Sequence, residues 1–170
     1  MAPTGPELRG PRVALVPVAP EHHEALLAIR RTPEVLRWWY APEAGFPGGD
    51  ADAVEYTILV GGEVAGYVQW SAEEDPHFRH AGYDTFLAPR FTGQGLGTEA
   101  GRVLCAHLVD DLGFHRIVID PEVENAAAIA SYRKVGFRPV GTMRRYSRDD
   151  DGAYHDGLLM DLLAEELVRQ

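Results

Sequence analysis

One segment in the middle of the chain constrains the fold more than any other. It reads Phe86-Leu-Ala-Pro-Arg-Phe-Thr-Gly-Gln-Gly-Leu-Gly-Thr98, with glycines at positions 93, 95 and 97. A strand pattern enters this loop and a helical pattern leaves it. Glycines let a backbone approach a ligand closely, and the free N–H groups and dipole of a helix start suit a phosphate. The segment therefore predicts a strand–loop–helix unit that binds a phosphorylated ligand, the structural alternative being a plain glycine-rich turn.

Two other phosphate-binding loops are alternatives for this segment. A nucleotide-hydrolysing P-loop requires Gly-Lys-Ser/Thr, and Gly97-Thr98 lacks the lysine. A dinucleotide site requires G-x-G-x-x-G and an acidic residue about 20 positions further on, a place that Asp120 fills. The spacing here is G-x-G-x-G, however, and the chain is too short for a doubly wound sheet beyond this unit. Dinucleotide binding is therefore the weaker interpretation.

The remaining periodicity predicts one α/β domain. Strands are expected at 13–18, 56–60, 63–70, 81–88, 117–119, 138–143 and 157–163, and helices at 21–31, from 33, at 96–112 and at 125–135. This order indicates a mixed sheet of about seven strands with helices on both faces. The domain is expected to span 12–170 and to follow a flexible Pro/Gly-rich leader at 1–11.

Charge and cysteine content exclude several classes of partner. The chain has 26 acidic and 16 basic residues, a formal charge of −10, so its field repels nucleic acid and anionic lipid and attracts cations. The single Cys105 rules out an internal disulfide framework and fits a reducing compartment. No stretch approaches the roughly 20 apolar residues of a membrane span. We expect a cytoplasmic protein, a monomer or homodimer, with no nucleic-acid or membrane partner.

Two motifs together resemble those of the GNAT acyltransferases. They are Gln94-Gly-Leu-Gly-Thr98 and Asn125-Ala-Ala-Ala-Ile-Ala-Ser-Tyr-Arg-Lys-Val-Gly-Phe137. The resemblance covers about 13–163 and implies the GNAT fold, with a splayed central strand pair and acetyl-CoA as co-substrate. The positions it assigns to that cofactor are Phe86, Leu87, Ala88, Gln94, Gly95, Leu96, Gly97, Thr98, Asn125, Ala128, Tyr132 and Lys134. The family usually has Arg or Gln where this chain has Thr92, so a side-chain contact is not carried over there.

The same resemblance implies how the reaction would proceed. Backbone N–H groups of 86–88 would face the thioester, and the phenol of Tyr132 would protonate the departing sulfur. Spacing alone favours a different interpretation, in which Tyr132 is a core aromatic on a stripe with Ile129 and Val135. Lys134 would reach a CoA phosphate, although an exposed cation near a helix C-terminus is an equal alternative.

Three further features are similar to the aminoglycoside 6′-N-acetyltransferases. These are Trp38-Trp39, the strand Gly82–Ala88, and Ile119-Asp-Pro121. A related branch that acylates siderophore lysines shares part of this pattern. The sub-family resemblance therefore suggests, without fixing it, an aminoglycoside as the amine that accepts the acetyl group.

Three aspartates are candidate ligands for such an amine. Asp84 lies in an apolar-leaning strand, where a carboxylate is costly unless it is paired or faces a wet cleft. We expect it to act as a base, directly or through water, and to hold an ammonium group, the alternative being a bond to a local backbone or Arg group. Asp120 ends a parallel strand, where α/β sheets place ligands, although capping the Pro121 turn would also explain it. Asp156 is a weaker candidate, because a solvated turn carboxylate is its default. Three converging carboxylates would suit a polycation.

Aromatic residues could add to this site. Trp38 and Trp39 could stack on sugar rings or on ammonium groups. Because they are adjacent on a helix, we expect only one to face the site, with core packing as the alternative. Tyr67 is a lesser candidate for a substrate contact. His77 and His80 lack converging partners, so no metal is expected.

These observations lead to one functional hypothesis and two alternatives. The chain is expected to transfer acetyl from acetyl-CoA to a primary amine of an aminoglycoside, the 6′-amine, and so to confer resistance. A second hypothesis is a GNAT enzyme for another amine, such as a siderophore lysine, a polyamine or a protein N-terminus. A third is a CoA-binding module without turnover.

Overall fold

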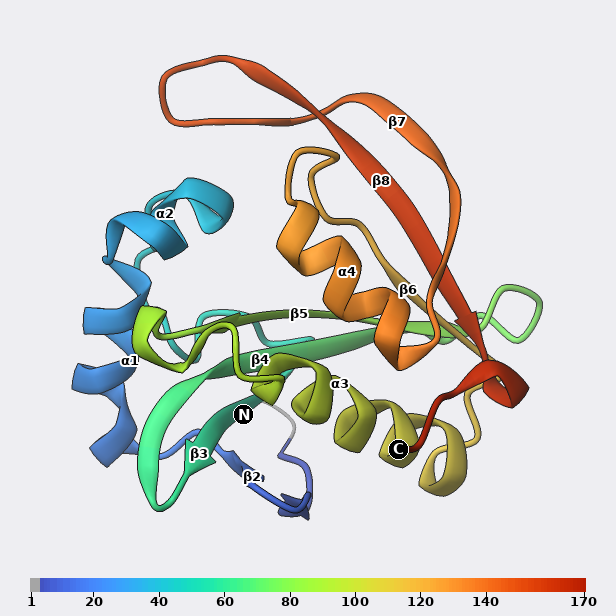
Figure 1. Cartoon of the computed structure of the whole chain (residues 1–170), viewed down its shortest axis with the longest axis horizontal. Helices are drawn as coiled ribbons and strands as arrows, with labels where there is room; N and C mark the ends of the chain where they lie inside the picture. Colours follow the sequence, from blue (N-terminus) through green and yellow to red (C-terminus); the bar gives the residue numbers. More distant parts are fainter. Residues whose placement is uncertain (1–3) are drawn as a thin grey trace.

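The computed structural model describes residues 4–170, which form an eight-stranded mixed sheet (Figure 1). The strands lie in the order β1-β2-β3-β4-β5-β6-β8-β7, and among residues 4–170 only the β5–β6 pair is parallel. Their bounds are β1 Leu8–Arg9, β2 Val13–Pro17, β3 Val54–Val60, β4 Glu63–Glu73, β5 His80–Leu87, β6 Arg116–Ile119, β7 Arg138–Arg148 and β8 Tyr154–Leu163.

Helices cover both faces of this sheet, as predicted. They are α1 His23–Arg30, α2 Pro33–Trp39, α3 Leu96–Ala106 and α4 Ala126–Val135. Two separate clusters of buried side chains show the two faces: Tyr67 packs with α1 and α2, whereas its neighbour Val68 packs with α3 and α4. Successive residues of a strand point to opposite faces, so the two helix pairs lie on opposite sides of β4.

Local signals explain where the two long helices begin and end. The expected stripe of α3 is present, because Leu96, Ala100 and Leu104 are all buried. After Ala106 the chain forms one π-helical turn, His107–Asp111, rather than the continuous helix to 112 that periodicity predicts. The side chain of Asn125 caps α4, and Gly136 ends it with a φ of 123°.

The N-terminal prediction needs a correction. Residues 1–3 of the expected leader lie outside the described residues, but Leu8 and Arg9 pair with Leu15 and Ala14 of β2. This pairing gives backbone groups of an edge strand their hydrogen-bond partners. Part of the predicted leader is therefore strand β1, which brings the sheet to eight strands instead of the expected seven. The other differences are strand ends: β4 extends to Glu73 and β7 to Arg148.

The parallel pair at the centre of the sheet opens toward one end. β5 and β6 are in register only at Ala81–Ile117 and Gly82–Val118. Beyond Gly82, β5 continues to Leu87 while β6 ends at Ile119. The splayed pair thus leaves one edge of β5 without a strand partner. The candidate site lies along this edge.

Candidate active site

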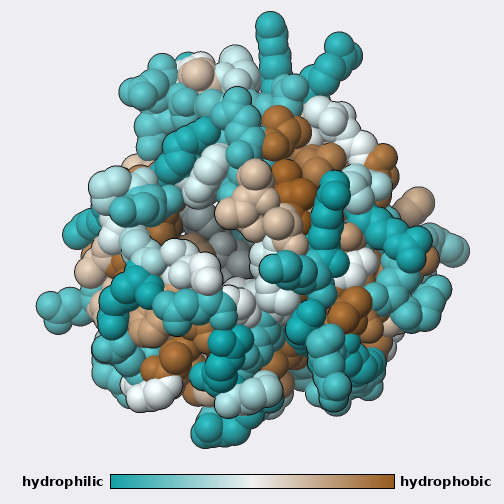
Figure 2. Space-filling view, in the orientation of Figure 1, coloured by the Kyte–Doolittle hydropathy of each residue, from teal (hydrophilic) through white to brown (hydrophobic). Residues whose placement is uncertain are grey.

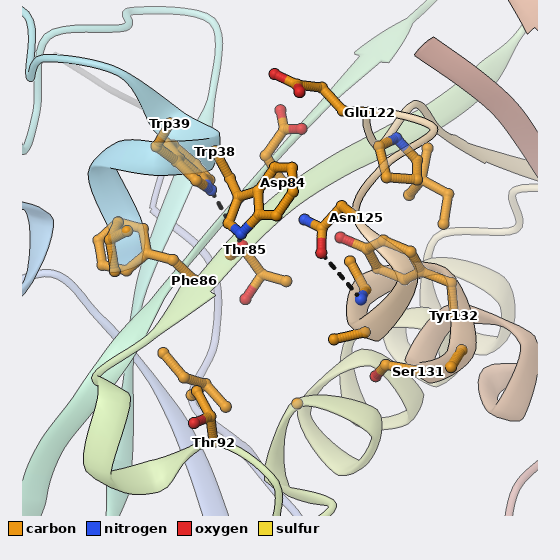
Figure 3. A pocket seen from close by; sticks show the side chains of 18 of the residues that line it. Trp38, Trp39, Asp84, Thr85, Phe86, Thr92, Glu122, Asn125, Ser131 and Tyr132 are labelled. Atoms are coloured by element: carbon orange, nitrogen blue, oxygen red, sulfur yellow. Dashed lines mark hydrogen bonds between the residues drawn. The ribbon is translucent and has the colours of Figure 1, made fainter. Parts of the chain in front are cut away.

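A cleft of about 800 Å³ opens at the splayed strands (Figure 3). It is lined by the end of α2, by β5, by the glycine loop and the start of α3, by the segment after β6, and by α4. Its volume is in the range of sites that hold small molecules and cofactors. Hydrophilic residues dominate the molecular face seen in Figure 2, with apolar residues in separate patches between them.

The glycine loop forms an open helix N-terminus at one end of the cleft. Gly93 and Gly95 have φ values of 74° and 78°, a left-handed conformation that favours glycine. The first intrahelical bond runs from Glu99 N to the Gly95 carbonyl (3.0 Å), so the N–H groups of 96–98 precede the hydrogen-bonded ladder. This end of the cleft therefore offers converging backbone donors.

Gly97 has a different role from the other two glycines. Its φ lies outside the left-handed region, and a Cβ placed on it would meet only Leu87 Cδ1 at 3.5 Å and Ser131 Oγ at 3.9 Å. The fold itself would therefore tolerate a methyl group there. The absence of a side chain at Gly97 keeps space open in front of the N–H groups.

Two residues expected at the cofactor do not line the cleft. The amide nitrogen of Gln94 donates to the Arg90 carbonyl (2.9 Å), which directs this side chain back onto the loop. The N–H of Ala88 donates to the Ala65 carbonyl on β4 (2.7 Å), and Ala88 is buried. Neither group is free to contact a ligand in the cleft, because each is engaged within the protein.

The second motif contributes a wall of the cleft through α4. Asn125 caps this helix by accepting from Ala128 N (3.2 Å), and its amide nitrogen points into the cavity (Figure 3). Ser131 Oγ lies 2.9 Å from Thr98 Oγ1, which ties α4 to the start of α3. Lys134 lines the same wall and is exposed. Ser131 was not expected from the sequence, although it lies within the motif.

Two of the expected aspartates, Asp84 and Asp120, line the cleft together. The Asp84 side chain is open to the cavity, yet protein atoms surround the carboxylate and displace most of its hydration. Burial, and to a smaller extent the charge of Asp120, raise the pKa of Asp84 to about 6, although the Gln69 amide partly opposes both effects. Asp120 accepts a hydrogen bond from the Tyr146 hydroxyl. Asp84 therefore exchanges its proton near neutral pH.

Tyr132 faces the same space from α4 (Figure 3). Its ring packs edge-on against Tyr83 and Phe137, with centroids 6.0 and 5.9 Å apart. Burial raises the pKa of Tyr132 well above its ordinary value, and the charges of Asp84 and Asp120 raise it further. The phenol therefore keeps its proton at neutral pH and is available as a hydrogen-bond donor.

Both tryptophans line the cleft, so the expectation that only one would do so is wrong. Trp39 donates from Nε1 to the Thr85 carbonyl (3.3 Å) and packs edge-on against Phe86 at 5.1 Å. Trp38 stands beside it, with the Arg37 guanidinium 4.1 Å from its ring centroid. The helix ends at this point, which lets adjacent residues reach one cavity.

Two expected substrate residues lie outside the cleft. Tyr67 is completely buried between the sheet and α1–α2, where its ring stacks on Phe86 with centroids 5.3 Å apart. Asp156 accepts the backbone N–H of Arg145 (2.7 Å), which lies in the irregular part of β7. Each residue is held by contacts of the fold, and neither is among those that line the cavity.

Sequence reasoning missed a group that joins α2 to the β7–β8 side of the cleft. The Tyr40 hydroxyl donates to Glu122 Oε1 (2.5 Å) and lies 3.0 Å from Ser147 Oγ. Arg37 also contacts Glu122, at 3.4 Å. Glu122 lines the cavity with the two aspartates, although its carboxylate is largely buried and paired with Arg37. Its only sequence signal is its place after Asp120.

Comparisons with known proteins identify the family. The acetyltransferase (GNAT) domain model matches residues 12–138. Spermidine N(1)-acetyltransferase of Escherichia coli (strain K12) is 25% identical over 168 residues, which cover 93% of this chain and 89% of that protein.

Solved structures agree with that match. Mycobacterium smegmatis RimJ in complex with CoA-disulfide superposes with a TM-score of 0.79 at 26% identity, covering 95% of this chain and 88% of the other. Aminoglycoside acetyltransferase AAC(6′)-Ib in complex with coenzyme A and kanamycin superposes with a TM-score of 0.72 at 25% identity, covering 91% and 96%. Within residues 4–170, none of the helices has the length and apolar character of a membrane span. The chain belongs to the GNAT acetyltransferase family.

Proposed function

We propose that this N-acetyltransferase moves the acetyl group of acetyl-CoA to a primary amine of a polycationic small molecule, with the 6′-amine of an aminoglycoside as the leading acceptor. The observation that carries the proposal is the pair Asp84 and Asp120, which share one cleft with an open helix N-terminus. A carboxylate with a pKa near 6 can hold an ammonium group and then take up its proton.

The glycine loop is suited to the pyrophosphate of acetyl-CoA. The N–H groups of Leu96, Gly97 and Thr98 supply donors, and the dipole of α3 adds a favourable field. Lys134, on the facing wall, supplies a cation for a further phosphate. The bound cofactor would then extend from this end of the cleft along the open edge of β5.

The open edge of β5 offers one donor to the thioester. The N–H of Ala88 points toward β4, where it donates to Ala65. Because backbone groups alternate in direction along a strand, the N–H of Leu87 points to the open edge instead. The Thr85 carbonyl on that edge is already bonded to Trp39. The Leu87 N–H is therefore the group we assign to the oxyanion that develops on the thioester carbonyl.

The transfer step follows from this arrangement. The acceptor arrives as an ammonium ion beside Asp84, loses a proton to that carboxylate, and attacks the thioester carbon. A C–N bond forms, and the C–S bond breaks as the oxyanion collapses. The second proton of the new amide nitrogen passes to the departing sulfur, which leaves as the CoA thiol, and Asp84 releases the first proton to water. Tyr132 donates a hydrogen bond to the leaving sulfur. The pKa of Tyr132 stays above that of an alkyl thiol, about 8.5. The phenol therefore stabilises the thiolate through this hydrogen bond and keeps its own proton.

Charge and aromatic surface favour an acceptor with several amines. Asp84, Asp120 and Glu122 line the acceptor end, and the face of Trp38 stands beside them. Ammonium groups gain more from carboxylates in a partly desolvated cleft than at an open surface. A linear polyamine is the second candidate acceptor, because similarity to the spermidine acetyltransferase extends over 93% of the chain.

Release of the CoA thiol tests the proposal. The enzyme is incubated with acetyl-CoA and with kanamycin, spermidine or a peptide that has a free N-terminal alanine. Turnover at micromolar kanamycin supports the leading acceptor, and turnover only on spermidine supports the second. A preference for the peptide, or CoA binding without turnover on any amine, contradicts the proposal.

A further inference from the structure

Three polar residues form a row across neighbouring strands on the α1–α2 face of the sheet. Glu55 of β3 lies directly opposite Gln69 of β4, and Gln69 lies directly opposite Asp84 of β5. Directly opposed residues share a face and have Cβ atoms about 5 Å apart, within reach of one another's side chains. The row therefore connects the carboxylate of the cleft with the interior of the sheet.

Tyr67 joins this row from two positions before Gln69 on the same strand. Its hydroxyl lies 2.5 Å from Glu55 Oε1 and 2.9 Å from Gln69 Oε1. The side chain is completely buried, and stacking on Phe86 fixes the ring. Glu55 is itself held by the Gly48 N–H at 2.9 Å. Burial raises the pKa of Tyr67, so its single proton stays between the two acceptors.

These contacts determine which way the Gln69 amide faces. Because its oxygen accepts from Tyr67, its NH₂ group is the end left to face Asp84, the residue directly opposite on β5. A hydrogen bond to the charged form of an acid favours that form. The amide thus opposes the loss of hydration that Asp84 suffers in the cleft.

We infer that Gln69 is a positioning residue that orients the Asp84 carboxylate toward the cleft, and that Tyr67 and Glu55 hold Gln69 in place. The inference rests on the proposed function for the importance of Asp84 in the reaction. It also gives the buried Tyr67 phenol a purpose other than a substrate contact.

Of the other ionisable groups that face Asp84, the charged one acts in the opposite sense. Asp120, at the end of β6, raises the pKa of Asp84 by its charge. Tyr132 of α4, Tyr146 of β7 and Tyr83 of β5 itself also interact with its charge. Among the described residues, Gln69 supplies the neutral group that lowers the pKa of Asp84.

The test measures the pKa of Asp84 directly, by ¹³C NMR titration of the aspartate carboxyl carbons in the unliganded protein. Gln69→Leu removes the donor and is expected to raise the pKa of Asp84 by about one to two units, the range for a hydrogen bond to a charged group. Tyr67→Phe keeps the ring and is expected to raise it by a smaller amount. Tyr56→Phe is the matched control, because Tyr56 is equally buried on the neighbouring strand and its hydroxyl has no hydrogen-bond partner among the described residues.

Kinetics supply the second readout. The acidic limb of kcat/KM for Gln69→Leu should move to higher pH by the same shift, with activity recovered at high pH, which mere structural damage would not produce. An unshifted Asp84 pKa in folded Gln69→Leu overturns the role of Gln69. An unshifted pKa in Tyr67→Phe overturns the support from Tyr67 and Glu55. Wild-type protein without turnover would instead contradict the proposed function, while the NMR titration would still decide the inference.

Discussion

Replacing Asp84 with asparagine removes the carboxylate while keeping the size of the side chain. Asparagine cannot take up the amine proton, so turnover should fall by about 10²–10⁴-fold, the usual contribution of a positioned proton acceptor. The wild-type pH profile should report the same group. With a pKa of about 6, the ionised fraction of Asp84 falls from about 0.9 at pH 7 to about 0.1 at pH 5. The kcat/KM of the wild type should therefore fall about tenfold over this interval.

Stability provides the control for this substitution, and its sign follows from the pKa. The folded protein binds the Asp84 proton more tightly than the unfolded chain does, because the pKa rises from 3.8 to about 6. Ionising Asp84 therefore lowers stability as the pH rises from about 4 to above 6. Asp84→Asn removes that penalty, so its Tm should exceed that of the wild type at pH 7 and equal it at pH 3.

The measurements are steady-state thiol release from pH 5 to 8.5, calorimetric binding of acetyl-CoA, and thermal unfolding. Acetyl-CoA affinity should be unchanged in Asp84→Asn, because the proposed contacts of the cofactor are at the other end of the cleft. A variant that retains wild-type turnover, or that keeps an inflection near pH 6, would refute the assignment of Asp84 as the base. Loss of acetyl-CoA binding would refute it as well.

Further predictions address the cofactor, the leaving group, the acceptor and the fold. Tyr132→Phe should lower kcat about 10- to 100-fold, the range for one hydrogen bond to a charged group, with little change in acetyl-CoA affinity, and unchanged kcat would remove its role at the sulfur. Gly97→Ala should leave Tm unchanged yet weaken acetyl-CoA binding at least tenfold by calorimetry, because the methyl group occupies space that the fold leaves open; unaltered affinity would contradict a pyrophosphate there. Acceptor KM should rise as NaCl increases from 50 to 300 mM, because the Debye length shortens from about 14 to about 6 Å, and a salt-independent KM would argue against a carboxylate-lined cleft. Arg30→Met should lower the free energy of unfolding by about 2–3 kcal/mol in urea titrations. The reason is that the buried guanidinium donates to the carbonyls of Trp39 and Ala41. A change below 0.5 kcal/mol would contradict this role of Arg30.

Elements with strong local signals could be predicted from the sequence. The stripe of α3, the Asn125 cap and the Gly136 stop of α4 each depend on nearby residues, and all are present. The short strand β1 could not be predicted, because Leu8 and Arg9 carry little strand signal and gain their conformation from pairing with β2. The ends of β4 and β7 were also predicted too early, because polar residues continue the hydrogen-bonded pairing of these strands.

The proposed acceptor side of the cleft was harder to predict from the sequence than the proposed cofactor side. The cofactor side depends on two motifs in which spacing encodes geometry. Tyr67 faces the core rather than a cleft because α1 and α2 pack on that face of the sheet. The residues around Tyr67 in the sequence do not indicate that these helices pack there. Glu122 becomes part of the cleft through Tyr40, 82 residues away in the chain.

We propose that the Asp84 cleft joins an acetyl group to an amine, so the two products should form together. The most direct measurement is the stoichiometry of the reaction: purified enzyme, acetyl-CoA and kanamycin are incubated, and the CoA thiol and the acetylated antibiotic are quantified in the same sample by mass spectrometry. We predict one acetylated primary amine for each thiol released. Thiol release without an acetylated amine, or no consumption of acetyl-CoA with kanamycin or spermidine, would contradict the account.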